Sequence, residues 1–349
     1  MKSSMKIRCS VMSNLHLEFA DVELPGGDVL FLAGDCFTAR PFQGGPLDSG
    51  KSKLLKRYKK FARKELSKYR EVFYVLGNHD FYGGIIEETV NSMRGFLVAE
   101  TPHVKLLDDS CVICEGVLII GSTLWATYGD GSYAAVEIGR GMNDFFQIRT
   151  KSPLLGPGKE RFYPHGPLWR TITVPDIAKR HRESLAYLRS ALKFSKENEM
   201  PAIVLTHHAP SYLSKTETFK HTDCGIDDAY YSNQHDIINN NPHAKIFIHG
   251  HTHDLAHYRI GETLIVSNPR GYFPDEDISR RFDPNREDFD LEEVVKAHST
   301  MSGRVMPAFE EMVSENTGIP ASPGQENKDM GSRDGKTGTD GIRFRSGMA

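Results

Sequence analysis

The sequence predicts an α/β fold in which helices cover two packed β-sheets. Short runs of apolar residues recur along the chain, and such runs are typical of strands that are covered on both faces. Segments with the periodicity of amphipathic helices lie between these runs. This alternation is characteristic of layered α/β proteins, which bind their ligands at the carboxyl ends of the strands.

Five apolar runs each end in residues of the types that bind metals. The runs and the polar residues after them are 6–12 with Asn14 and His16, 29–33 with Asp35, 72–76 with Asn78, His79 and Asp80, 202–205 with His207 and His208, and 245–248 with His251 and His253. Further strands are expected over 111–120, 124–125 and 263–266. This number of strands favours two packed sheets over one.

Two amphipathic helices are expected between the strands. The first carries an apolar stripe from Leu54 to Tyr69. The second begins at the capping-box pattern Thr173-Val-Pro-Asp176 and continues its stripe to Leu192.

One domain is expected over residues 1–298. Within it, residues 126–175 are rich in glycine, proline and aromatic residues, which predicts an insertion that forms a loop or cap. A tail over 299–349 follows. Its low content of aromatic residues and its lack of periodicity predict disorder from about residue 315.

Composition argues against several classes of protein. The 349 residues include 43 Lys+Arg and 46 Asp+Glu, and a net charge of −3 is not that of a strongly basic nucleic-acid binder. No apolar run approaches the roughly 18–20 residues of a membrane span, and the N-terminus lacks the apolar core of a signal peptide. The 5 cysteines are scattered, unlike those of a disulfide framework. We expect a soluble, cytoplasmic protein without a membrane partner; the sequence does not indicate its oligomeric state.

The polar residues at the strand ends have the chemistry of a metal site. Imidazole nitrogens, carboxylates and amide oxygens bind divalent transition metals, and two metals can share one carboxylate. A single histidine or aspartate after a strand is more often a cap or an ordinary loop residue. Five such strand ends in series favour a metal site over polar loops that merely close a sheet.

The order of these motifs resembles that of the calcineurin-like metallophosphoesterase superfamily. The motifs are Asn14-Leu-His16, Gly34-Asp35, Gly77-Asn78-His79-Asp80, Thr206-His207-His208 and Gly250-His251-Thr252-His253. The resemblance covers about residues 5–275 and implies a four-layer double β-sandwich flanked by helices, with a two-metal site. It also implies hydrolysis of phosphomonoesters or phosphodiesters, with nucleotides and nucleic acids among the substrates of the family.

The resemblance also implies a role for each motif residue. The first metal is assigned to Asn14, His16, Asp35 and His253, and the second to Asp35, Asn78, His207 and His251. His79 is the expected proton donor at the ester oxygen. His208, expected beside the substrate, and Asp80 lie just outside the ligands. Arg270 is expected to reach a substrate phosphate, with a surface arginine in a turn as the alternative.

The expected chemistry follows from this ligand set. Two cations about 3.5–4 Å apart lower the pKa of a bridging water, and the resulting hydroxide displaces the leaving group in line without a covalent enzyme intermediate. Mn²⁺, Fe, Zn²⁺ and Ni²⁺ all suit mixed imidazole, carboxylate and amide ligands, so the sequence leaves the identity of the metal open.

Asn14 departs from the pattern of the superfamily, which normally has Asp at this position. An amide oxygen can bind a metal but adds no charge, so we expect binding at the first site to be weaker by at least roughly 10–100-fold. Two explanations stay open, a natural variant with a loosely held metal and a substitution that quiets the enzyme. A catalytically silent interaction module with the same fold is the main alternative function.

Two further patterns offer weaker alternatives. Residues Gly45–Ser52 match the P-loop pattern of nucleotide-binding proteins, but a P-loop should follow its strand directly. The helix expected over 51–70 is rich in lysine and arginine. Such a helix can guide a nucleic-acid backbone, although a solvated helix face is the more common role.

Overall fold

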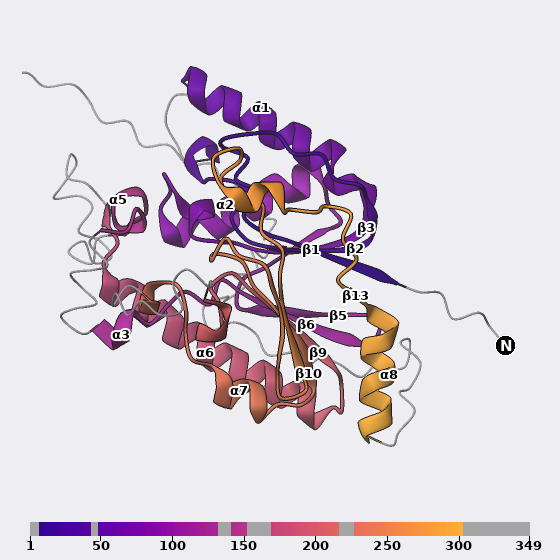
Figure 1. Ribbon diagram of the computed structural model, residues 1–349. Helices are drawn as coiled ribbons and strands as arrows, with labels where there is room; N and C mark the ends of the chain where they lie inside the picture. Colours follow the sequence, from indigo (N-terminus) through magenta and orange to yellow (C-terminus); the bar gives the residue numbers. More distant parts are fainter. Residues whose placement is uncertain (1–6, 43–47, 132–140, 152–168, 216–226, 303–349) are drawn as a thin grey trace, which may run out of the picture.

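The computed structural model describes residues 7–42, 48–131, 141–151, 169–215 and 227–302. Within these ranges the chain forms two large β-sheets that pack face to face, with helices on the outer face of each (Figure 1). The predicted four-layer α/β sandwich is therefore confirmed.

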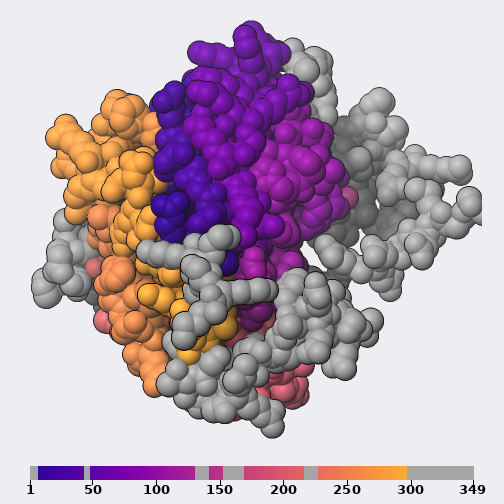
Figure 2. Space-filling model, turned by 90° about the vertical axis from the view of Figure 1, so that its right-hand side faces the viewer, coloured from indigo at the N-terminus to yellow at the C-terminus, as the bar shows by residue number. Residues whose placement is uncertain are grey.

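The first sheet has five strands in the order β13-β1-β2-β3-β4. Strands β1 to β4 run parallel, and β13 pairs antiparallel with β1 at the edge. Their bounds are β1 Arg8–Met12, β2 Gly27–Ala33, β3 Tyr69–Val75, β4 Val104–Leu107 and β13 Phe289–Asp290. The β13–β1 pairing joins the two ends of the described chain, and Figure 2 shows C-terminal residues in orange packed beside the indigo N-terminal ones.

The second sheet has six strands in the order β11-β12-β10-β9-β6-β5. Its four central strands are parallel, and an antiparallel hairpin partner lies at each edge. Their bounds are β5 Ser110–Cys114, β6 Val117–Ser122, β9 Ala202–Thr206, β10 Ala244–Ile248, β11 Ala256–Ile260 and β12 Thr263–Ser267. A separate two-stranded sheet pairs β7 Arg149–Lys151 with β8 Trp169–Thr171.

Helices form the outer layers (Figure 1). The α-helices are α1 Ser49–Lys64, α2 Ile86–Glu100, α3 Tyr128–Gly131, α5 Asp144–Gln147, α6 Val174–Glu197, α7 His235–Asn239 and α8 Leu291–Ser302. The 3₁₀ turns are η1 Arg40–Phe42, η2 Leu66–Lys68, η3 His79–Phe81, η5 Tyr212–Ser214, η6 Asp227–Ala229 and η7 Asp277–Arg280. None of the helices within the described ranges combines the length and apolar character needed to cross a membrane.

Three apolar clusters fill the spaces between the layers. The central cluster lies between the two sheets and includes Phe31 and Phe73 from the first sheet and Ile203 and Ile248 from the second. A second cluster packs α1 and α2 against the first sheet, and a third packs α6 and α7 against the second. The sheets are therefore apolar on both faces, which explains why their strands lack polar alternation in the sequence.

Most of the predicted elements are present with small shifts in their ends. The capping box at Thr173 and Asp176 begins α6 as predicted. The first helix was predicted too long, because α1 ends at Lys64 and Tyr69 begins β3. Leu124 and Trp125 are not a strand, and both have left-handed backbone angles, with φ of 64° and 53°.

The predicted insertion contributes α3, α5, β7 and β8 to the described structure. The predicted tail lies almost entirely outside the described residues, although α8 crosses the predicted boundary at 298/299.

We predict that Phe31→Ala lowers the free energy of unfolding by about 3–5 kcal/mol. The Phe31 side chain is completely buried between the sheets and stacks on Phe73, with ring centroids 5.3 Å apart. Chemical denaturation measures the change. Phe146→Ala is the matched control, because 68% of Phe146 is exposed and its loss should change stability by less than about 0.5 kcal/mol. Equal losses for the two variants would contradict the assignment of the core.

Candidate metal centre

The predicted ligands lie where the chain leaves the strands, and most of these turns use left-handed backbone. Asn14, His16, Asp35, His251 and His253 have φ of 52°, 45°, 56°, 66° and 48°. Non-glycine residues rarely adopt such angles, and they concentrate at functional sites. The turns bring side chains from β1 and β2 in the first sheet and from β10 in the second into one space at the carboxyl ends of both sheets.

Two glycines of the motifs are required by close packing. A Cβ atom on Gly34 would lie 2.2 Å from Nδ1 of His207, and one on Gly77 would lie 2.1 Å from Oδ1 of Asp35. Both distances are shorter than any tolerated contact. The glycines therefore allow the loops after β2 and β3 to meet His207 from the other sheet.

One half of the site contains two histidines whose Nε2 atoms face each other. Nε2 of His16 and Nε2 of His253 lie 3.1 Å apart. The Nδ1 atoms lie beside carboxylates, 3.1 Å from Oε1 of Glu18 for His16 and 2.6 Å from Oε2 of Glu276 for His253. When each imidazole carries its single proton on Nδ1, toward the carboxylate, both Nε2 lone pairs face the same space, as a bound cation requires.

The other half gathers acceptor atoms around His207. Its Nδ1 donates to the carbonyl of Ala33 at 2.7 Å, and its Nε2 lies 3.0 Å from Oδ1 of Asn78 and 3.3 Å from Oδ2 of Asp35. Nε2 of His251 is buried and has no hydrogen-bond partner among the described residues. Ligand atoms of Asp35, His207 and His251 all lie within 4.8 Å of one another. This arrangement of acceptors fits a divalent cation.

The charges in the site centre on Asp35. Burial raises the pKa of this carboxyl, but His207, His79 and His16 outweigh burial and hold the pKa well below its usual range. Burial lowers the pKa of His207, and the Asp35 carboxylate reverses that shift and raises it. Burial lowers the pKa of His251 well below its usual value, which keeps this imidazole neutral.

Asn14, predicted as a ligand of the first metal, forms hydrogen bonds through both ends of its amide. Its Oδ1 accepts the backbone N–H of His251 at 3.0 Å, and its Nδ2 donates to Oδ2 of Asp35 at 3.3 Å. An amide nitrogen has no lone pair for a metal. Reversing the amide would turn its N–H groups toward the N–H of His251. Asn14 therefore serves as a hydrogen-bond bridge between Asp35 and the loop after β10.

His79 stands beside the predicted ligands as the sequence predicts for a proton donor. Its backbone N–H donates to Asp35 at 2.8 Å, and its ring stacks on Tyr82 with centroids 4.1 Å apart. Nδ1 lies 3.1 Å from Glu18, and Nε2 lies 3.1 Å from the hydroxyl of Tyr272. Burial lowers the pKa of His79, but Asp35 and Glu18 outweigh burial and raise it to about 9.

Asp80 ties together the loops that carry these residues. Its carboxylate accepts the backbone N–H groups of Asp35, Phe37 and Gly77 at 2.7–2.8 Å and the hydroxyl of Tyr74 at 2.5 Å. Asp80 therefore fixes the turns after β2 and β3 through their backbone.

The two predicted substrate contacts face backbone carbonyls, and the His208 ring packs against that of His251 with centroids 4.2 Å apart. Nδ1 of His208 faces the carbonyl of Thr123, and burial lowers the pKa of His208 well below its usual value. The guanidinium of Arg270 donates to the carbonyls of Leu15, Ala20 and Asp21. Arg270 is 5% exposed, so these bonds hold the loop after β1 in place of the predicted phosphate contact.

The sequence predicted no contact with the candidate ligands for three carboxylates in the site. Glu18 and Glu276 face His16 and His253, and Asp144 in α5 accepts Nδ2 of Asn78 at 2.8 Å. The Asp144 bond turns Oδ1 of Asn78 toward His207. Only Asp144 had a local signal, because it lies among polar and aromatic residues of the predicted insertion.

A model of the calcineurin-like phosphoesterase family matches residues 13–255, which include the predicted ligands and His79. The chain belongs to this family. Members are typically dependent on two metal ions, in agreement with the candidate ligand groups of this phosphoesterase.

Several known proteins are similar to this chain at low sequence identity. A curated relative, the uncharacterized protein L509 of Acanthamoeba polyphaga mimivirus, is 26% identical over 287 residues, or 75% of this chain and 90% of the relative. The phosphopantetheinyl hydrolase of Mycobacterium tuberculosis is 15% identical with a TM-score of 0.47, covering 80% of this chain and 94% of its own. A putative 5'-nucleotidase of Staphylococcus aureus is 16% identical with a TM-score of 0.40, covering 76% of this chain and 49% of its own.

Two adjoining cavities open at the site of this phosphoesterase. The smaller, of about 320 Å³, is lined by Asp35, Asn78, His251 and His253. The larger, of about 710 Å³, is lined by residues that include Phe19, Arg40 and Phe273. His79 lies on the walls of both cavities, together with Tyr82, Asn143, Tyr272 and Glu276.

We predict that Asp80→Ala lowers the free energy of unfolding by about 3–5 kcal/mol and reduces metal content. The change leaves three buried N–H groups without their acceptor and frees the loops that hold Asp35 and Asn78. Thermal unfolding and metal analysis of the purified chain check both effects. Tyr74→Phe is the control, because it removes one hydrogen bond to Asp80 and should cost about 1 kcal/mol. A loss for Asp80→Ala no larger than that of the control would contradict this role.

Proposed function

We propose that this chain hydrolyses phosphomonoesters or phosphodiesters with two divalent cations, Mn²⁺, Fe, Zn²⁺ or Ni²⁺. The observation that carries the proposal is the convergence of imidazole nitrogens and an amide oxygen on both sides of the buried Asp35 carboxylate. His16, Asp35 and His253 would hold one cation. Asp35, Asn78, His207 and His251 would hold the other, so that Asp35 is shared.

The chemistry that two such cations supply when bound is activation of the attacking water and neutralisation of charge on the phosphoryl oxygens. The water oxygen forms a bond to phosphorus as the ester bond to the leaving oxygen breaks. His79 gives the proton that this leaving oxygen takes, and Glu18 and Asp35 favour the protonated imidazole before the transfer. Nε2 of His79, which lies 3.1 Å from the Tyr272 hydroxyl, would be the atom that gives this proton.

The two cavities suggest how a substrate lies. The smaller one, between the candidate ligands, suits the phosphoryl group, and the larger one begins at His79 and suits the leaving group. Phe19 and Phe273 are 57% and 44% exposed on its wall, and Arg40 adds a positive charge. A leaving group with a flat apolar part and an anionic part suits this wall, so nucleotides and nucleic-acid ends remain among the proposed substrates.

Binding of a nucleic-acid backbone to the basic helix α1 is a second, weaker proposal. Several of its basic side chains already form ion pairs, with Lys60 bound to Asp21 and Lys59 and Arg63 bound to Glu100. These pairs leave less charge for a polyanion. A P-loop at the start of α1 has less support still, because the Asp48 carboxylate caps the helix at the backbone N–H of Lys51. Residues 45–47 of that pattern lie outside the described structure.

A catalytically silent module of the same fold is the alternative that Asn14 favours. Asn14 adds no charge to the first cation site, and both ends of its amide are engaged. The complete second ligand set and the position of His79 favour an enzyme over a silent module.

We expect His79→Ala to lower kcat by about 10²–10⁴-fold while two metals per chain are retained. The substitution removes the proposed proton donor and leaves every proposed ligand in place. Hydrolysis of an aryl phosphomonoester and an aryl phosphodiester with added Mn²⁺ gives the rates, and metal analysis gives the content. His103→Ala is the control, because His103 bonds the Leu66 carbonyl at the opposite end of the first sheet. An unchanged kcat would remove His79 from the proposed role.

We expect Asn14→Asp to tighten Mn²⁺ binding at the first site by about 10–100-fold and to raise activity at limiting metal. Without metal the same variant should be less stable than the parent, because a second carboxylate then lies against Asp35 in place of an N–H donor. Calorimetric titration and thermal unfolding with and without Mn²⁺ measure the two effects. Equal rates for parent and variant across the titration would contradict this assignment of Asn14.

A further inference from the structure

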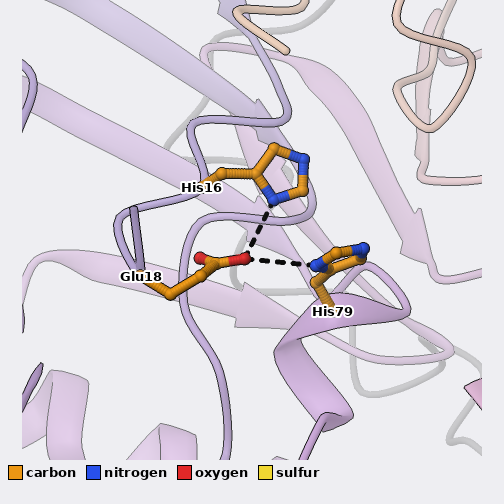
Figure 3. Close-up of side chains that lie close together, drawn as sticks. All are labelled: His16, Glu18 and His79. Atoms are coloured by element: carbon orange, nitrogen blue, oxygen red, sulfur yellow. Dashed lines mark hydrogen bonds and ion pairs between the residues drawn. The ribbon is translucent and has the colours of Figure 1, made fainter. Parts of the chain in front are cut away.

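We infer that Glu18 is a positioning residue that connects the first metal site to the proton donor. This inference rests on the proposed function, because it assigns Glu18 a part in that reaction. Figure 3 shows the Glu18 carboxylate between the rings of His16 and His79, which come from different strand ends of the first sheet. One carboxylate thus holds a proposed metal ligand and the proposed acid together.

The contacts of Glu18 are specific to one oxygen. Oε1 lies 3.1 Å from Nδ1 of His16 and 3.1 Å from Nδ1 of His79. Oε2 is buried and has no hydrogen-bond partner within the described part of the chain. Arg57 donates to the backbone carbonyls of Leu17 and Glu18 at 2.8 and 3.0 Å, which fixes the loop that carries the carboxylate.

These two hydrogen bonds determine which ring nitrogens carry protons. Since a carboxylate accepts from both Nδ1 atoms, His16 turns the lone pair of Nε2 toward His253 and the first metal site. His79 turns Nε2 toward Tyr272 and the larger cavity, where the leaving group is proposed to lie. The same carboxylate therefore orients a proposed ligand and the proposed acid.

Glu18 also supplies charge where Asn14 supplies none. A carboxylate behind a metal-bound imidazole increases its basicity and its affinity for the cation. Both histidines of the first site have such a partner, Glu18 for His16 and Glu276 for His253. In the second site, Nδ1 of His207 faces the carbonyl of Ala33 instead. The first site thus receives negative charge from behind its imidazoles.

Glu276 provides a matched control within the same site. It contacts His253 and accepts the backbone N–H of Tyr272, and its side-chain contacts do not include His79. Loss of its charge should weaken the first metal site without altering the proton donor. Loss of the Glu18 charge should weaken the first metal site and also alter the proton donor.

A third cation is the competing explanation, because ligand atoms of His16, Glu18 and His79 lie within 4.8 Å of one another. A cation there would need unprotonated Nδ1 atoms on both rings, and His16 would then serve two cations at once. The number of bound metals separates the two explanations.

The test compares Glu18→Gln and Glu276→Gln with the parent chain. Calorimetric titration with Mn²⁺ should show a loss of affinity at the weaker site of about 10–100-fold for both variants, with the tighter site unchanged. At saturating Mn²⁺, kcat is measured for aryl phosphates whose leaving groups range from p-nitrophenol to phenol. For Glu18→Gln, kcat should fall about 10-fold more with phenyl than with p-nitrophenyl phosphate, because the poorer leaving group depends more on the acid. For Glu276→Gln, kcat should fall by the same factor with the two substrates.

Several outcomes would overturn the inference. An unchanged Mn²⁺ affinity in Glu18→Gln would show that Glu18 does not support His16 as a ligand. An equal fall in kcat with both leaving groups would show that Glu18 does not act through His79. Three Mn²⁺ per parent chain and two in Glu18→Gln would show a third cation instead. If the parent chain cleaves no ester, the proposed function fails, and the proposed action of Glu18 on the acid fails with it. The Mn²⁺ affinity of Glu18→Gln would still test whether Glu18 supports His16 as a ligand.

Discussion

The burial of one carboxylate, that of Asp35, is the constraint on which the rest of the site depends. Asp35 is 1% exposed, and a buried charge is unfavourable unless charged or hydrogen-bonding partners surround it. Its partners come from both sheets, with Asn14 and His79 from the first and His207 from the second. The packing of the two sheets therefore serves to enclose this charge.

The architecture places these partners with little freedom. Parallel strands in both sheets end at the same edge, and left-handed turns aim the residues after them into the space between the sheets. Gly34 and Gly77 let the turns approach His207, and Asp80 fixes two of the turns through their backbone. The precision of the site thus originates in backbone constraints at the strand ends.

Asn14 changes how charge is distributed rather than how the site is built. Its amide keeps the hydrogen bonds that link Asp35 to the loop after β10, so the position preserves the geometry of the site without adding charge. Carboxylates stand instead behind the imidazoles of His16 and His253.

The sequence by itself determined the strands, the order of the motifs and therefore the family. Apolar runs of strand length and the residues that end them are local features, and the parallel sheet brings those ends together in any protein with this topology. The same local pattern wrongly predicted that the first helix continues to Tyr69 and that Leu124 and Trp125 form a strand. Periodicity alone does not show where the backbone angles change.

Only the tertiary structure decided which atoms face the site. The orientation of the Asn14 amide depends on the N–H of His251 in the other sheet, and Arg270 is engaged by carbonyls more than 240 residues earlier in the chain. Glu18 and His79 are 61 residues apart, and Asp144 and Asn78 are 66 apart. Side-chain pairing across such separations follows from the packing of layers, which no local pattern encodes. The sequence thus predicted the candidate ligands, and the tertiary structure showed which carboxylates lie beside His16 and His253.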